Sequence, residues 1–335
     1  MSSESATAAS FAGLPPPGSV VVVRAFGWIM LATLVVFLLD NWLIAWMKWP
    51  GVAPIFAGQG SGLAWLQLGG YVAGVVVAIG FVLNTPQRGL RLESETFSNV
   101  NAFVIRAAFW GVLFVGVADA AISFLRVENL LPAVVGEHLG TELGRSHFRG
   151  PAVHLPLLAL GIVVAAFTRT IGFHWLALLI VIAELTIVIT RFVFSYEQAF
   201  MGDLVRFWYA ALFLFASAYT LIEEGHVRVD VFYTTFAPRR KGLVNAIGSI
   251  LLGMSVCWVI LLVGMGGRSS IINGPLINFE VTQQGFGMYV KYLMAGFLGL
   301  FAISMLIQFV AYLLESVADW RGEPGARSHE AGAGH

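Results

Sequence analysis

The stretch HWLALLIVIAELTIVITRFVF, residues 174–194, decides the fold class of this chain. It holds a single carboxylate and a single arginine among 21 mostly apolar residues. A helix of about 20 apolar residues crosses the roughly 30 Å hydrocarbon core of a membrane. The stretch therefore predicts a transmembrane helix.

Seven further apolar runs have the same character, and they lie roughly at 21–46, 63–83, 101–125, 152–168, 203–222, 243–265 and 288–314. We expect an all-α fold, a polytopic integral membrane helical bundle of about eight transmembrane helices. The run at 152–168 has only 17 residues before Arg169, so it is either a tilted span or partly re-entrant. Seven spans are the alternative.

The composition excludes several other classes of protein. Of the 335 residues, 58% are hydrophobic and 11% are charged, which is more apolar surface than the core of a soluble domain hides. The formal net charge is zero and there is no basic tract, so nucleic-acid binding is not expected. The single cysteine, Cys257, excludes an intrachain disulfide and a cysteine-cluster metal site.

Lysine and arginine are distributed unequally between the two sets of loops. With a cytoplasmic N-terminus, ten of these cations face the cytoplasm, namely Arg24, Arg88, Arg91, Arg169, Arg228, Arg239, Arg240, Lys241, Arg321 and Arg327. Five face the other side, namely Lys48, Arg126, Arg145, Arg149 and Arg268. Because cytoplasmic loops carry the excess of positive charge, the count predicts an N-in/C-in orientation.

Two carboxylates lie inside apolar runs, Glu184 near the middle of 174–194 and Asp119 nearer to one end of 101–125. A carboxylate at the bilayer centre costs at least about 2.5 kcal/mol, so Glu184 should face protein or be protonated. Arg191 shares its helix face but lies about 10 Å along the axis. We therefore expect a partner for Glu184 on another helix, and we favour helix–helix contact over ion coupling for both intramembrane polar residues.

No catalytic, metal or cofactor site is expected. His154 and His174 begin consecutive spans at opposite faces, so they cannot share a haem. The Gly-rich phosphate loop, GxSxG and HExxH do not occur. We predict that the chain is not an enzyme.

Charge is concentrated in LIEEGHVRVDVFY, residues 221–233, where Glu223, His226, Arg228 and Asp230 lie between two apolar runs. As a helix this stretch has an apolar stripe, and its alternating valines also permit an extended segment. Both structures stay open. We favour an interface with lipid headgroups or a partner subunit over a solvated connector.

The longer stretch RFVFSYEQAFMGDLVRFWYAALFLFASAYTLIEEGHVRVDVF, residues 191–232, resembles the small membrane subunit, the DctQ type, of tripartite ATP-independent periplasmic (TRAP) transporters. The family pattern has an R-[YF]-V-F helix end, an E-E-L-x-R helix start and an E-x-G-H-[IV]-R-V-D loop. Here RFVF begins at Arg191, and the loop motif runs from Glu223 to Asp230. The helix start departs from the pattern, with Gly202 and Asp203 in the two glutamate positions before Arg206.

The resemblance covers about residues 172–318. It implies a non-catalytic small permease subunit in a bacterial cell inner membrane, with a large DctM-type permease subunit and a periplasmic solute-binding protein as partners. It also implies ion-coupled import (symport) of an organic acid or related solute. The positions then expected at a partner or lipid interface are Arg191, Asp203, Arg206, Glu223, His226, Arg228 and Asp230.

The chain divides on this interpretation into a disordered tail (1–19), an N-terminal four-span extension (20–170), a DctQ-like four-helix small-permease domain (171–318) and a disordered cytoplasmic tail (319–335). Two alternatives come from other classes. One is a self-sufficient secondary transporter that uses Glu184. The other is a membrane electron-transfer subunit, which would need cofactor ligands at matched depth.

Overall fold

The computed structural model describes residues 18–170, 172–222, 233–281 and 287–325, and these contain helices and no strands. Eight helices in these ranges are long and apolar enough to cross a membrane. They are α2 (Gly18–Met47), α4 (Gly62–Asn84), α5 (Leu90–Val127), α8–η1–α9 (Ser146–Phe167), α10 (Phe173–Phe194), α11 (Ala199–Ile222), the continuous helix α12 (Pro238–Gly248), η3 (Ser249–Met254) and α13 (Ser255–Met265), and α15 (Lys291–Arg321). The predicted eight-span, all-α fold is confirmed.

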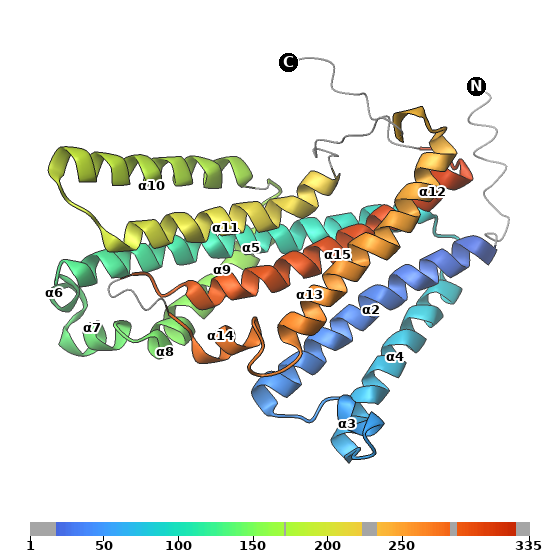
Figure 1. The fold of residues 1–335 in the computed structure, drawn as a ribbon, viewed down its shortest axis with the longest axis horizontal. Coiled ribbons are helices and arrows are strands. Elements are labelled where there is room, and N and C mark those ends of the chain that lie inside the picture. Colours follow the sequence, from blue (N-terminus) through green and yellow to red (C-terminus); the bar gives the residue numbers. More distant parts are fainter. Residues whose placement is uncertain (1–17, 171, 223–232, 282–286, 326–335) are drawn as a thin grey trace.

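Two long helices form the centre of the bundle (Figure 1). α15 packs against α2, α5, α11, α12 and α13. In its most apolar 18-residue stretch, 67% is buried. α5 packs against α9, α11 and α15. α10 is the opposite case, because only 11% of its most apolar 18-residue stretch is buried. It packs mainly on α11.

The core combines residues from both sides of position 171. Phe109 of α5 lies edge-on to Phe215 of α11, with ring centroids 5.6 Å apart. Val115 of α5 and Leu306 of α15 have no exposed surface and belong to the same apolar cluster. The helices of the predicted extension therefore pack directly on those of the predicted small-permease domain.

α5 begins at Leu90, well before the apolar run that starts at 101. The additional turns form because Leu90, Ser94, Phe97 and Asn101 recur at helical spacing and are all buried. Ser94 donates to the carbonyl of Ala311 in α15 at 2.8 Å. A mixed polar and apolar stripe therefore continues the helix beyond the hydrophobic run.

The fourth span is longer than its apolar run predicts, because the continuous helix from Ser146 to Phe167 has 22 residues. A helix of this length reaches across a bilayer without a re-entrant turn. Its first part contains the π-helical segment η1 (Gly150–His154), which follows α8 (Ser146–Arg149) and precedes α9 (Leu155–Phe167).

Short helices gather at one end of the bundle, here called the loop end, and they are α6 (Leu131–Val135), α7 (Glu137–Leu143) and α14 (Asn273–Asn278). The opposite end, here called the terminal end, contains the start of α2 and the end of α15, where Arg321 Nη1 donates to Ser19 Oγ at 2.7 Å. The remaining short helices are α3 (Ala53–Phe56) and η2 (Tyr233–Thr235). The first residues of α2 and the last residues of α15 thus lie on the same side of the bundle.

Candidate functional site

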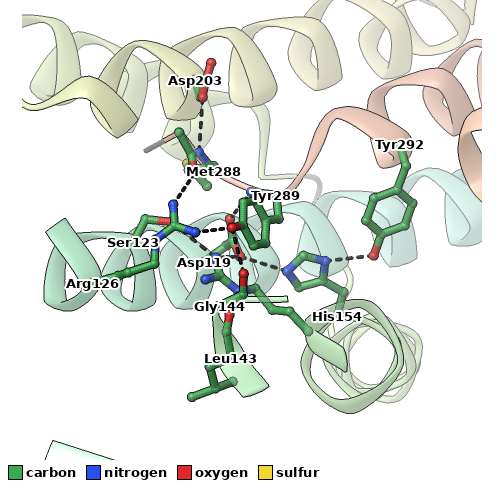
Figure 2. A network of polar contacts seen from close by, with 12 residues as sticks. Asp119, Ser123, Arg126, Leu143, Gly144, His154, Asp203, Met288, Tyr289 and Tyr292 are labelled. Atoms are coloured by element: carbon green, nitrogen blue, oxygen red, sulfur yellow. Dashed lines mark hydrogen bonds and ion pairs between the residues drawn. The ribbon is translucent and has the colours of Figure 1, made fainter. Parts of the chain in front are cut away.

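Asp119 is the centre of a buried polar network at the loop end (Figure 2). Its Oδ1 accepts from Arg149 Nη1 at 2.8 Å and lies 3.0 Å from His154 Nε2. Its Oδ2 accepts from the backbone N–H of Tyr289 at 2.8 Å. A carboxylate without a proton only accepts, so His154 donates through Nε2. The imidazole Nδ1 then lies 2.7 Å from the hydroxyl of Tyr292.

The local helix geometry directs two side chains from one segment at Asp119. Arg149 and His154 are five residues apart, because Arg149 directly precedes the π-helical turn η1 and His154 is its last residue. Hydrogen bonds in a π-helix join residues i and i+5, so such residues lie nearly above one another. Gly150 permits the tight packing beneath them, because a Cβ there would lie 2.3 Å from the ring of Phe279.

A second set of contacts holds the segment that leads into α15. The ring of Tyr289 lies under the guanidinium groups of Arg126 and Arg149, at 4.6 and 4.2 Å from its centroid. Arg126 also donates to the carbonyl of Gly287 at 3.0 Å. The backbone N–H of Met288 donates to Asp203 in α11 at 3.1 Å. Asp119 and Asp203 thus anchor one segment to two helices.

The centre of this network is fully buried. Asp119, Arg149 and His154 have no exposed surface, so a solute in the aqueous phase does not reach them. Breaking a buried ion pair costs several kcal/mol because it leaves one charge unpaired. Within the described ranges no group of three His, Cys, Asp or Glu residues could hold a metal ion. The network joins α5, the helix from Ser146 to Phe167 and the segment before α15 at the loop end.

α10 presents a contrasting surface. Leu176, Ile180 and Ala183 are its buried side chains, at the i, i+4, i+7 spacing of a narrow seam. The rest of the helix is largely exposed and apolar, including Trp175, Val181, Leu185, Val188, Phe192 and Val193. Glu184 lies in the middle of this helix and is also exposed. It makes no hydrogen bond or ion pair with any described residue.

The sequence from α10 to α15 matches a known family. Residues 177–319 match the family model of tripartite ATP-independent periplasmic transporters, DctQ component. This part of the chain is similar to the DctQ component. No curated protein and no solved structure was found to match. The resemblance predicted from the motifs is confirmed, and α2 to α9 lie outside the matched residues.

Within the DctQ region, the predicted interface residues differ in position. Asp203 and Arg206 form an i, i+3 ion pair, with 3.6 Å between Oδ1 and Nη1. Asp203 is turned inward and has a 15% exposed side chain, whereas Arg206 is 68% exposed. Arg191 is exposed and lies 4.0 Å from Glu197. The predicted positions Glu223, His226, Arg228 and Asp230 lie outside the described residues.

Glu184 was expected to have a partner on another helix, and the described residues contain no hydrogen-bond or ion-pair partner for it. Asp119 does hold helices together, and its partners were not predicted. Arg149 was counted only as a loop cation, and His154 was considered only as a haem ligand. The available signal was the position of both residues at the start of an apolar run, where a polar side chain lies next to buried helix ends.

Proposed function

We propose that the chain is the non-catalytic small permease subunit of a TRAP transporter in a bacterial inner membrane. On this proposal it scaffolds a large DctM-type subunit that imports an organic acid or related solute by ion coupling, together with a periplasmic solute-binding protein. The match of residues 177–319 to the DctQ component supports the proposal. The extensive burial of the polar network at the loop end also favours a rigid scaffold over a moving transport element.

The observation that carries the proposal is the exposed carboxylate of Glu184 on α10. Placing Glu184 in lipid at the bilayer centre costs at least about 2.5 kcal/mol. α10 offers an otherwise apolar surface on both sides of this residue. A neighbouring transmembrane protein with a hydrogen-bond donor at that depth removes the cost. We therefore assign the exposed face of α10 to the contact with the large subunit.

Co-purification of the two permease subunits in detergent tests this contact. Val181→Trp adds bulk to the exposed face of α10, and Val263→Trp adds the same bulk to an exposed position of α13. We expect the α10 variant to lose most of the complex and the α13 variant to keep it. Equal recovery of both complexes would reject α10 as the docking face.

Uptake into liposomes tests the scaffold role. The purified chain alone should transport no solute, and uptake should need the large subunit and the binding protein. The alternative, a self-sufficient secondary transporter, rests on Glu184 as a coupling group. Uptake by the single chain that disappears in Glu184→Gln would establish this alternative and overturn the scaffold.

The N-in/C-in orientation is part of the proposal and rests on the ten-to-five distribution of cations. In a Cys257→Ser background, single cysteines at Ser10, Ser269 and Ser328 are exposed to an impermeant thiol reagent on intact cells. We expect labelling at position 269 and none at 10 or 328. The reverse pattern would invert the topology.

A further inference from the structure

α5 and α9 pack closely and then separate toward the terminal end. A Cβ at Gly161 of α9 would lie 2.5 Å from the backbone nitrogen of Gly111 in α5, so the two backbones touch there. Trp110 of α5 donates to the hydroxyl of Thr168 at 3.1 Å, which holds the end of α9 against α5. Beyond this contact the surface opens into a groove of about 540 Å³.

The groove combines positive charge, uncharged hydrogen-bonding groups and apolar walls, and among its lining residues are Thr96, Asn99, Phe103, Arg106, Ala166 and Arg169. Arg106 and Arg169 form no ion pair with any acidic side chain that the structure describes. Arg106 Nε is buried and has no hydrogen-bond partner among the same residues. Two guanidinium groups without an acidic partner favour an anion, and phosphate accepts hydrogen bonds from such groups well.

The level of the groove across the membrane indicates the source of the anion. Arg106 is 21 residues before Val127, the end of α5 at the loop end. At 1.5 Å per residue this is about 32 Å, close to the thickness of the hydrocarbon core. Arg169 is two residues after Phe167, the last residue of α9. Both cations are therefore at the level of the lipid headgroups, on the side of the terminal end.

The surface next to the groove suits acyl chains. Along α9, Leu160, Ile162, Val163 and Phe167 are exposed and apolar, and they lie on the bilayer side of Arg169. The cationic groove is placed to meet the anionic headgroup of a phospholipid, and the apolar face of α9 next to it is placed to meet the acyl chains. Basic pockets between transmembrane helices bind anionic headgroups on the cytoplasmic side.

We propose that the α5–α9 groove binds one anionic phospholipid, with its phosphate between Arg106 and Arg169 and its acyl chains along α9. This gives the N-terminal extension a function that the DctQ region does not have. The site does not depend on the docking of a large subunit, so the two proposals fail separately.

Native mass spectrometry of the full chain, after extraction from nanodiscs of phosphatidylcholine with a minor share of phosphatidylglycerol, tests the site. One surface cation contributes about fivefold to the affinity for anionic lipid. We expect Arg169→Gln to reduce bound phosphatidylglycerol about fivefold and the pair Arg106→Gln with Arg169→Gln about 25-fold. Arg169 lies outside the helices and is exposed, so its single variant reports binding even where the double variant folds poorly.

The matched control is Arg239→Gln with Arg240→Gln, which removes two exposed cations at the start of α12. This control should keep the bound phosphatidylglycerol. An equal loss in both double variants, or no loss in the groove variants, would overturn the proposal. An excess of inorganic phosphate should not displace the lipid. Displacement by inorganic phosphate would make the groove a site for a soluble anion and would reject the lipid.

Discussion

Asp119 and Glu184 are both carboxylates inside apolar helices, and the structure gives them opposite surroundings. Asp119 has no exposed surface and is contacted by Arg149, His154 and the backbone of Tyr289. Glu184 lies on the exposed face of α10 and contacts no described polar group. The first carboxylate has its hydrogen-bond partners in its own chain, and the second has none among the described residues.

The difference follows from where each helix lies. α5 is surrounded by α9, α11 and α15, so a polar side chain on it meets protein in most directions. α10 lies at the edge of the bundle beside α11 (Figure 1). The carboxylate on the central helix α5 therefore finds its partners within its own chain, whereas we propose that a partner subunit covers the one on the peripheral helix α10.

The largest effect is expected from Arg149→Leu, which leaves the carboxylate of Asp119 buried without its cation. Removing one partner of a buried ion pair costs about 3–5 kcal/mol. We expect a large fall in the melting temperature and in the yield of monodisperse protein in detergent. The measurements are thermal unfolding and size-exclusion chromatography of the purified chain.

The control is Arg145→Leu, because Arg145 pairs with Glu142 at 2.7 Å but is 64% exposed. Exposed pairs contribute about 0–1 kcal/mol, so this variant should melt close to the native chain. Similar stability of the two variants would mean that the Asp119 network does not hold the loop end together.

The sequence predicts the helices well because length and composition suffice for a transmembrane span. The ends of the runs at 63–83 and 174–194 agree closely with α4 and α10. The start of α5 was missed because its first turns mix buried apolar residues with polar ones, among them the buried salt bridge between Arg24 and Glu93, at 2.6 Å. Such a contact joins residues far apart in the chain, and hydropathy does not record it.

The candidate site was predicted only in part. Both intramembrane carboxylates were identified because charge is rare in apolar runs. Their different roles were not, because that depends on which helix is central. The partners of Asp119 come from a loop and from the start of α15, so only the tertiary fold brings them together.

A smaller effect is expected from Tyr292→Phe, which removes the hydroxyl next to His154 Nδ1. The imidazole stays bound to Asp119, but a buried nitrogen loses its partner. Such a loss costs about 1–2 kcal/mol. The melting temperature should fall by a few degrees, clearly less than in Arg149→Leu. A fall as large as that of Arg149→Leu would show that the histidine, rather than the arginine, is the essential partner of Asp119.

Asp203 and Arg206 give a comparison within one ion pair. Asp203→Ala removes the acceptor of the Met288 N–H, so we expect a loss of about 1 kcal/mol. Arg206→Ala removes an exposed cation, for which exposed pairs suggest about 0.3–0.5 kcal/mol. In thermal unfolding of the isolated chain, Asp203→Ala should therefore have a lower melting temperature than Arg206→Ala. Equal values would mean that the contact with Met288 adds nothing.

The smallest effect on the isolated chain is expected from Glu184→Leu. The glutamate contacts no described polar group, so its removal breaks no bond, and leucine suits an exposed position on a transmembrane helix. The melting temperature of the purified chain should stay within error of the native value, whereas Asp119→Leu should be severely destabilised. Co-purification with the large subunit should respond in the opposite way, because the carboxylate would lose a donor on that subunit. A destabilised Glu184→Leu chain would place the partner of Glu184 inside this protein. If Glu184→Leu changes neither the melting temperature of the chain nor its co-purification with the large subunit, the carboxylate has no role in stability or in docking. The contrast drawn here between Glu184 and Asp119 would then be wrong.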